Sequence, residues 1–147
     1  MHYKRKKGKS ISKAKKYLYN GQEYKSGLEV YMAKVLTENN IKFEYESKKF
    51  ILQEGFHFNL ESWERQANSK GEFKDRGDTK VREISYTPDF VGDGFIIETK
   101  GYANESFPMK YKMFKKSING EEDLSIYKPQ IKAECDLVIK LILKQKK

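Results

Sequence analysis

Apolar residues recur at helical spacing just after Ser26. Ser26 and Glu29 have the spacing of a capping box, in which two side chains satisfy backbone N–H groups at the start of a helix. The dipeptide Asn39-Asn40 is typical of a helix end. The pattern therefore predicts a helix that opens at Ser26 and closes at Asn39-Asn40. Its apolar stripe falls at i, i+3, i+4, i+7 and i+8: Leu28, Tyr31, Met32, Val35 and Leu36.

Two further stretches alternate as strands do. Residues 41–46 place apolar side chains at every second position, which predicts a half-buried strand. Residues 85–101 contain two short apolar runs on either side of Asp93-Gly94, a dipeptide that favours a two-residue type I′ hairpin turn. That turn fixes the register, because directly opposed residues follow from its position. The expected pairs are Gly92 with Phe95, Val91 with Ile96, Phe90 with Ile97, and Asp89 with Glu98.

The remaining segments complete an α/β pattern. Phe50-Ile51-Leu52 and the alternating residues 56–60 predict a strand pair or an extended hairpin, followed by a polar loop over residues 61–80. Residues 108–117 predict a basic amphipathic helix with three inward residues: Met109, Met113 and Phe114. A strand is expected over 124–127 and a last helix from Pro129, with an apolar face of Ile131, Cys135, Val138, Leu141 and Ile142. Together these elements predict a mixed β-sheet flanked by helices.

Length and composition limit the class of protein. The 147 residues suit one domain, and an aromatic content of 14% argues against disorder. No apolar run approaches the length of a membrane span, and no secretory leader is apparent, so a cytoplasmic location without a membrane partner is expected. The one cysteine, Cys135, leaves no internal disulfide and reads as a buried structural thiol.

The positive charge is concentrated at the start of the chain. The formal net charge is +9, yet residues 1–16 hold eight basic and no acidic residues, so the rest carries only +1. Residues 1–24 are therefore expected to form a basic arm ahead of a domain over 25–147. Such an arm grips nucleic-acid phosphates, although it could equally be a solvated tail. Its basic residues are Lys4, Arg5, Lys6, Lys7, Lys9, Lys13, Lys15 and Lys16.

Candidate chemistry gathers on one face of the expected hairpin. Asp89 and Glu98 oppose each other, and Lys100 returns to the same face because strand side chains alternate with period two. Two facing carboxylates repel unless a positive charge lies between them. Geometry alone leaves two interpretations open, a site for an oxygen-liking cation such as Mg²⁺ and a solvated ion network.

The order and spacing of residues in this stretch resemble the sequence motif of a known superfamily. Pro88-Asp89 followed by Glu98-Thr99-Lys100 is the signature of the PD-(D/E)XK nucleases. The wider match, residues 86–90 with 98–101, together with Ser26-Gly27-Leu28-Glu29 and residues 41–46, resembles the phage endonuclease I family of Holliday-junction resolvases. The resemblance covers roughly residues 25–46 and 84–102. The polar segment at about 53–83 is longer than that family leads one to expect, and it lies in the region where the subunits of that family exchange strands.

The resemblance implies a fold and an activity. The fold is a restriction-endonuclease-like α/β core, and the activity is Mg²⁺-dependent hydrolysis of branched DNA by a phage-encoded homodimer, with Mn²⁺ able to substitute. The expected location is the cytoplasm of a bacterium or an infected host cell. The catalytic residues it implies are Glu29, Asp89, Glu98 and Lys100. The metal-proximal groups it implies are Asp89, Glu98, the Thr99 carbonyl and Glu44, which could otherwise be a solvated charge.

Three functions remain open at this point. The first is the structure-selective DNA endonuclease. The second is another nuclease of the same superfamily, linked to restriction, transposition or DNA packaging. The third is a non-catalytic nucleic-acid-binding module. In each case Lys110 and Lys112, on the expected basic helix, are candidates for phosphate contacts, although a solvated helix face would have the same pattern.

Overall fold

The computed structural model describes residues 17–100 and 104–145. Three helices and several short strands form a mixed α/β structure, which confirms the expected class. The helices are α1 (Gly27–Glu38), α2 (Phe107–Ile118) and α3 (Lys132–Gln145). The strands are β1 (Tyr17–Tyr19), β2 (Gln22–Tyr24), β3 (Phe43–Tyr45), β4 (Phe50–Gln53), β5 (Phe56–Phe58), β6 (Trp63–Glu64), β7 (Lys74–Asp75), β8 (Thr79–Val81), β9 (Ile84–Tyr86), β10 (Phe90–Gly92), β11 (Phe95–Ile97) and β12 (Ser125–Tyr127).

The body of the molecule is a four-stranded sheet in the order β12-β11-β10-β3. Only β11 and β12 run parallel, so the sheet is mixed. The hairpin β10–β11 has the predicted register, with Phe90 opposite Ile97 and Gly92 opposite Phe95. Its turn differs from the prediction. A type I′ turn needs positive φ at both central residues, and here only Gly94 has one, at 76°.

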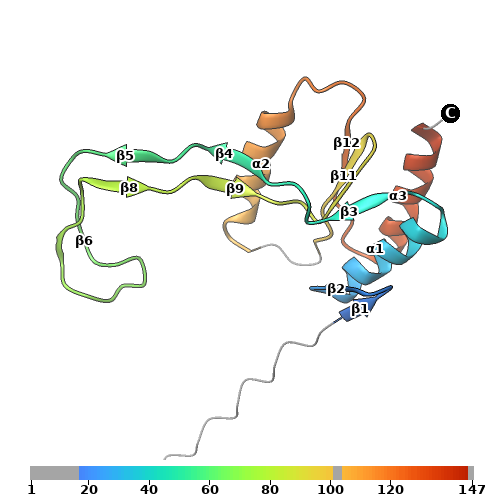
Figure 1. Cartoon of the computed structure of the whole chain (residues 1–147), viewed down its shortest axis with the longest axis horizontal. Helices are drawn as coiled ribbons and strands as arrows, with labels where there is room; N and C mark the ends of the chain where they lie inside the picture. Colours follow the sequence, from blue (N-terminus) through green and yellow to red (C-terminus); the bar gives the residue numbers. More distant parts are fainter. Residues whose placement is uncertain (1–16, 101–103, 146–147) are drawn as a thin grey trace, which may run out of the picture.

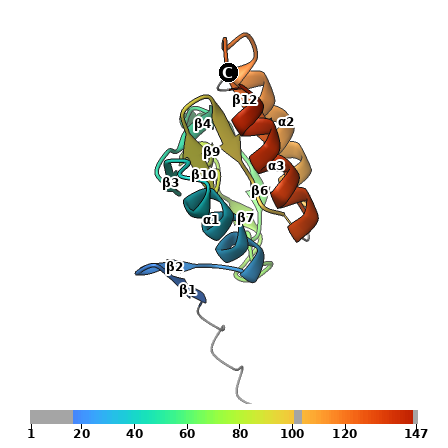
Figure 2. The same cartoon turned by 90° about the vertical axis from the view of Figure 1, so that its right-hand side faces the viewer.

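Helices cover both faces of this sheet (Figures 1 and 2). Helices α1 and α3 pack against the face that carries Phe90, Phe95 and Ile97, and together they bury the larger core. Helix α2 packs on the other face, where a second core forms around Ile96 and Phe114. Cover on both faces explains why β10 and β11 are so apolar: all three residues of β11 are buried, and Phe90 of β10 is buried with them.

Helix α1 forms as predicted and is held at both ends. Ser26 is its N-cap, and the Ser26 side chain accepts a hydrogen bond from the Glu29 N–H. Asn39 is its C-cap. The short hairpin β1–β2 packs against α1, so residues 17–24 belong to the folded body. Residues 1–16 of the expected arm lie outside the described residues.

Residues 50–86 form a long two-stranded ribbon that extends away from the body (Figure 1). Three successive antiparallel pairs build it: β4 with β9, β5 with β8, and β6 with β7. The expectation of an extended hairpin is therefore confirmed, whereas the loop expected over 61–80 contains three short strands. Near its end, Trp63 and Phe73 contact each other with ring centroids 6.0 Å apart, yet they are 56% and 62% exposed.

The two later helices form, but their buried faces differ from the predicted ones. In α2 the inward residues are Phe107, Tyr111 and Phe114, whereas Met109 is exposed. The larger aromatic rings bury more apolar area than the methionine and set the orientation of the helix. Helix α3 begins at Lys132, three residues beyond Pro129. Ile131, just before the helix, and Leu141, within it, are exposed. None of the helices in the described ranges is long and apolar enough to cross a membrane.

Candidate functional site

Three carboxylates lie side by side across the sheet at the ends of β3, β10 and β11. The register pairs Phe90 with Tyr45 on one side and with Ile97 on the other. One position further along, the Glu46 N–H donates to the Asp89 carbonyl at 2.8 Å, so Glu46 and Glu98 flank Asp89. We call Glu46, Asp89 and Glu98 the acid row. They line a cleft of about 300 Å³ together with Lys25, Glu29, Tyr86, Thr87, Thr99, Lys100, Asn104, Ser106, Phe107 and Lys110.

Asp89 is the central member of the acid row and is only 8% exposed. Its Oδ2 atom accepts hydrogen bonds from both the N–H and the hydroxyl of Thr99, each at 2.8 Å. Burial, and then the charges of Glu98 and Glu29, raise the pKa of Asp89 to about 7 against the opposing effect of the Thr99 bonds. The ionised form of this carboxyl is therefore costly unless a cation approaches it.

Glu98 is buried beside it and is held by a phenol. The Tyr86 hydroxyl donates to Glu98 Oε2 at 2.6 Å. Burial raises the pKa of Glu98, while the bond from Tyr86 and the charge of Lys100 act in the opposite direction. Lys100 itself lies with its Nζ 4.5 Å above the ring of Phe107. Asp89, Glu98 and Lys100 thus meet in one cleft.

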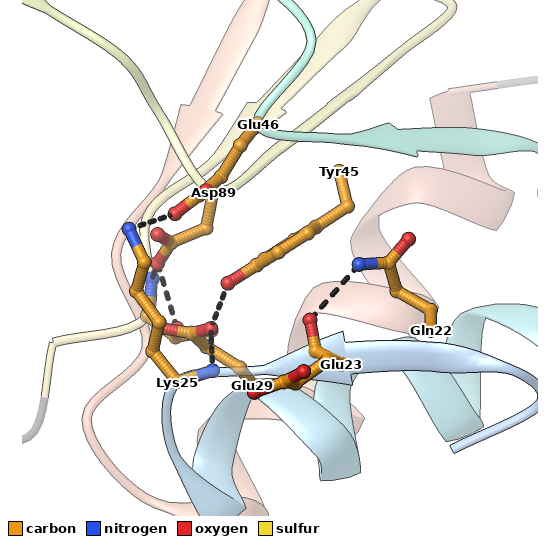
Figure 3. Close-up of polar contacts among 8 residues, drawn as sticks. Gln22, Glu23, Lys25, Glu29, Tyr45, Glu46 and Asp89 are labelled. Carbon is orange, nitrogen blue, oxygen red and sulfur yellow. Dashed lines mark hydrogen bonds and ion pairs between the residues drawn. The ribbon is translucent and has the colours of Figure 1, made fainter. Parts of the chain in front are cut away.

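Glu29 reaches the same cleft from the first turn of α1 and is buried. Its Oε2 accepts hydrogen bonds from the backbone N–H of Lys25 at 3.0 Å and from the hydroxyl of Tyr45 (Figure 3). Burial, and then the bond to Glu29, raise the pKa of Tyr45 well above its usual range. Only half of the expected capping box forms, because the Glu29 carboxylate bonds to the N–H of Lys25. The charge of Glu29 also raises the pKa of Asp89.

Two charged residues of the cleft were not predicted from the sequence. Lys25 and Glu46 form an ion pair at 2.6 Å, and in Figure 3 their side chains lie beside Asp89 and Glu29. The bond to Glu46 raises the pKa of Lys25. Glu46 has a φ of 47°, a left-handed conformation that is uncommon outside glycine. The signal for Glu46 was present in the strand alternation, since it lies on the same strand face as Glu44.

Several predicted site residues are not brought to the cleft. Glu44 pairs with Val91, is exposed, and lines a separate cavity with Ile41 and Phe43. Glu46, two residues on, occupies the place in the cleft that was expected for Glu44. Lys110 lines the cleft, whereas Lys112 is exposed and does not. The arm residues Lys4, Arg5, Lys6, Lys7, Lys9, Lys13, Lys15 and Lys16 all precede residue 17, where the description begins.

The donor atoms of the cleft can be compared with what a divalent cation requires. Within residues 17–100 and 104–145, no group of three or more His, Cys, Asp or Glu side chains is arranged to hold a metal ion. Mg²⁺, however, keeps several waters and is usually bound by one or two carboxylates plus substrate phosphate. Both hydrogen bonds to the Asp89 side chain go to Oδ2, so Oδ1 accepts none from the described residues. Asp89 and Glu98 with solvent therefore fit the modest ligand set of Mg²⁺.

A comparison of the chain with protein-family models, with curated proteins and with solved structures finds no match. The assignment of a function therefore depends on the geometry and electrostatics of the cleft.

Proposed function

We propose that this protein is a Mg²⁺-dependent endonuclease of the PD-(D/E)XK type that hydrolyses DNA, with branched DNA such as a Holliday junction as its substrate. The observation that carries the proposal is the meeting of Asp89, Glu98 and Lys100 with Glu29 in one cleft. Those four residues come from two elements that are far apart in the sequence. The raised pKa of Asp89, caused by burial among other acids, adds a specific need for a cation there.

The proposal includes a restriction-endonuclease-like fold. A mixed sheet with a central hairpin and helices on both faces supports it. The acid row lies at the end of that sheet, beside the first turn of α2. Each acid of the row lies one residue beyond the end of a paired strand, and this placement gives the fixed positions that a hydrolytic site requires.

Each cleft residue has a defined task in this proposal. Asp89 and Glu98, with the Thr99 carbonyl, would hold Mg²⁺ (or Mn²⁺), and the bound ion would stabilise the negative oxygens of the phosphodiester. Thr99 orients Asp89 through two hydrogen bonds, and Tyr86 orients Glu98. The Lys100 ammonium donates hydrogen bonds to the attacking water or to a phosphate oxygen. Glu29, fixed by Tyr45 and the Lys25 N–H, accepts a proton or a water hydrogen bond.

The proposed partners follow from charge and from the resemblance. A formal net charge of +9 suits a polyanionic substrate, and the basic residues of the N-terminal arm would bind DNA phosphates. We propose a homodimer, as in the resolvases that the chain resembles, acting in the cytoplasm of a bacterium or of a phage-infected cell. The ribbon of residues 50–86 replaces the shorter segment of those enzymes, and a restriction-, transposition- or packaging-linked nuclease is the alternative that this difference favours.

One observation favours a second candidate, a non-catalytic nucleic-acid-binding module. The acids of the cleft already have partners within the protein: Thr99 for Asp89, Tyr86 for Glu98, and Lys25 for Glu46. Such partners would stabilise an ion network with no need of metal. The two candidates differ in one measurable property, because only the first hydrolyses DNA.

The test is cleavage of a labelled four-way junction and a matched linear duplex in Mg²⁺, with Asp89→Ala as the inactive variant. Asp93→Asn, in the exposed turn of the same hairpin, is the matched control because it removes an acid outside the cleft. The proposal predicts that the wild type and Asp93→Asn cut the junction, whereas Asp89→Ala binds it without cutting. If the wild type binds DNA but cuts none of it in Mg²⁺ or Mn²⁺, the binding module is correct.

A further inference from the structure

Beside the acid cleft, three lysines gather over one pair of aromatic rings. Phe107 and Tyr111, one turn apart on α2, stack with their centroids 5.3 Å apart and an interplanar angle of 24°. Lys100 Nζ lies 4.5 Å from the Phe107 centroid, and Lys115 Nζ lies 5.0 Å from that of Tyr111. Lys128 Nζ lies 5.8 Å and 5.3 Å from the two centroids. We call these five residues the lysine–ring surface.

The three lysines come from different parts of the chain. Lys100 follows β11, Lys115 lies on the second half of α2, and Lys128 follows β12. Folding therefore brings their charges together, and no run of basic residues in the sequence indicates the cluster. Cation–π attraction to the two rings fixes each ammonium group, with a contribution of about 0.5–1 kcal/mol at an exposed site.

The positive charges of two of the three lysines are not balanced by an ion pair, whereas Lys100 lies near Glu98. Lys115 and Lys128 are exposed, and neither forms an ion pair with a carboxylate in the ranges that the structure covers. Ring faces offset only part of the repulsion between neighbouring ammonium groups. An anion with more than one charged group would relieve the rest, and holding the lysines over the rings in advance reduces the entropy lost on binding.

The position of the surface identifies that anion. Lys100 and Phe107 line the acid cleft, so the surface begins at the cleft wall and continues along α2 to Lys115 and Lys128. We propose that the lysine–ring surface binds the sugar–phosphate backbone of the nucleic-acid strand that enters the cleft, with Lys115 and Lys128 contacting phosphates outside it. This inference rests on the proposed function, because it takes the cleft as the place where a strand is held.

The test measures DNA binding separately from cleavage. Anisotropy of a labelled duplex is recorded in EDTA over a salt series for the full-length wild type and for Lys115→Gln/Lys128→Gln. Each lost phosphate contact reduces the slope of log K against log salt by about 0.7–0.9, so the slope should fall by about 1.5. The affinity at physiological salt should fall about 10-fold. The charge-conserving Lys115→Arg/Lys128→Arg should keep the wild-type slope, because arginine retains both the charge and the ring contact.

The matched control is Lys140→Gln/Lys144→Gln, which removes the same charge from exposed positions of α3. That helix packs on the opposite face of the sheet from α2. An equal loss of affinity and slope in this control would show a general charge effect and overturn the lysine–ring surface. An unchanged slope in Lys115→Gln/Lys128→Gln would overturn it as well.

Cleavage in Mg²⁺ separates this inference from the proposed function. The lost phosphate contacts in Lys115→Gln/Lys128→Gln should raise the KM for DNA about 10-fold, in step with the loss of affinity, whereas Lys140→Gln/Lys144→Gln should leave it near the wild-type value. If the wild type and the glutamine variant differ in slope as expected but the wild type cuts no DNA, the lysine–ring surface is supported and the nuclease is contradicted. If the wild type cuts DNA and the two slopes are equal, the nuclease is supported and the lysine–ring surface is contradicted.

Discussion

The four-stranded sheet and the ribbon are both built from short strands, yet they differ in what surrounds them. Helices cover both faces of the sheet, and Phe90 in its centre is 0% exposed. The ribbon between β4 and β9 extends away from the helices, and Phe56 on it is 45% exposed (Figure 1). The same alternation of apolar residues thus yields a buried core in the sheet and an exposed surface on the ribbon.

Two aspartates show what that difference does to chemistry. Asp89, at the end of the covered sheet, has its pKa raised to about 7 by burial and by neighbouring acids. Asp75, on the ribbon, has its pKa lowered because the N–H groups of Ser62 and Gly77 donate to its carboxylate in water. Enclosure by helices therefore makes the ionised form of Asp89 costly, whereas the carboxylate of Asp75 is stabilised at the surface.

The largest expected difference between the two regions is in packing. Phe90→Ala should lower the free energy of unfolding by about 3–5 kcal/mol, because it leaves a cavity between α1 and the sheet. Phe56→Ala should lower it by less than about 1 kcal/mol, because the ring is already half exposed. Urea denaturation of both variants measures this. Equal losses of unfolding free energy would mean that Phe56 is as well packed in solution as Phe90, and would contradict the difference between the two regions.

The next difference is in pH dependence. The pKa of Asp89 is raised from an ordinary value near 3.8 to about 7, so its contribution to stability is complete below pH 4 and is lost as the pH rises to about 7. Asp89→Asn should therefore be more stable than the wild type at pH 8, by on the order of 2 kcal/mol. Asp75→Asn should be less stable at pH 8, since a lowered pKa contributes stability above the ordinary value.

Thermal unfolding of both variants between pH 4 and pH 8 tests these opposite signs. The gain from Asp89→Asn should disappear at pH 4, where the wild-type carboxyl is protonated in the folded state and nearly half protonated in the unfolded one. A loss of stability in Asp89→Asn at pH 8 would contradict the account of the buried acid.

The smallest expected difference concerns single hydrogen bonds. Tyr86→Phe removes the donor to buried Glu98 and should cost about 1–2 kcal/mol of unfolding free energy. It should also slow cleavage about 10-fold or more, because Glu98 loses its orientation. His57→Gln removes the exposed bond to Asp78 on the ribbon and should change stability by less than about 0.5 kcal/mol. Chemical denaturation and Mg²⁺-dependent cleavage rates measure both, and similar effects would contradict the difference in burial.

Local patterns were enough to predict most elements of the body, but not the hairpin β1–β2. The cap at Ser26 and the register around Asp93-Gly94 depend on residues that are neighbours in sequence, and both form as expected. The stripe on α1 forms in part, because Leu28 and Tyr31 are only half-buried. The same local logic brought Asp89, Glu98 and Lys100 together. The turn type and the start of α3 were missed by small margins, because φ at Asp93 and the end of the loop after β12 depend on packing.

Packing between segments distant in sequence determined the features that local patterns did not predict. Period-two alternation puts Glu44 and Glu46 on the same strand face, but only the pairing of β3 with β10 decides which of them reaches Asp89. In α2, Met109 and Phe107 each fit an apolar stripe, and the sheet accepts the larger ring. The path of the ribbon and the gathering of Lys100, Lys115 and Lys128 likewise depend on segments distant in sequence.

The central proposal is that Asp89 and Glu98 bind a divalent cation, and Mg²⁺-dependent thermal unfolding at pH 8 tests it most directly. A ligand that binds only the folded state stabilises it by about 2.7 kcal/mol at 100 times its dissociation constant. The account predicts that Mg²⁺ raises the melting temperature of the wild type and of the exposed-turn control Asp93→Asn, and leaves that of Asp89→Asn unchanged. A wild-type melting temperature that does not respond to Mg²⁺ or Mn²⁺, or an equal response in Asp89→Asn, would contradict it.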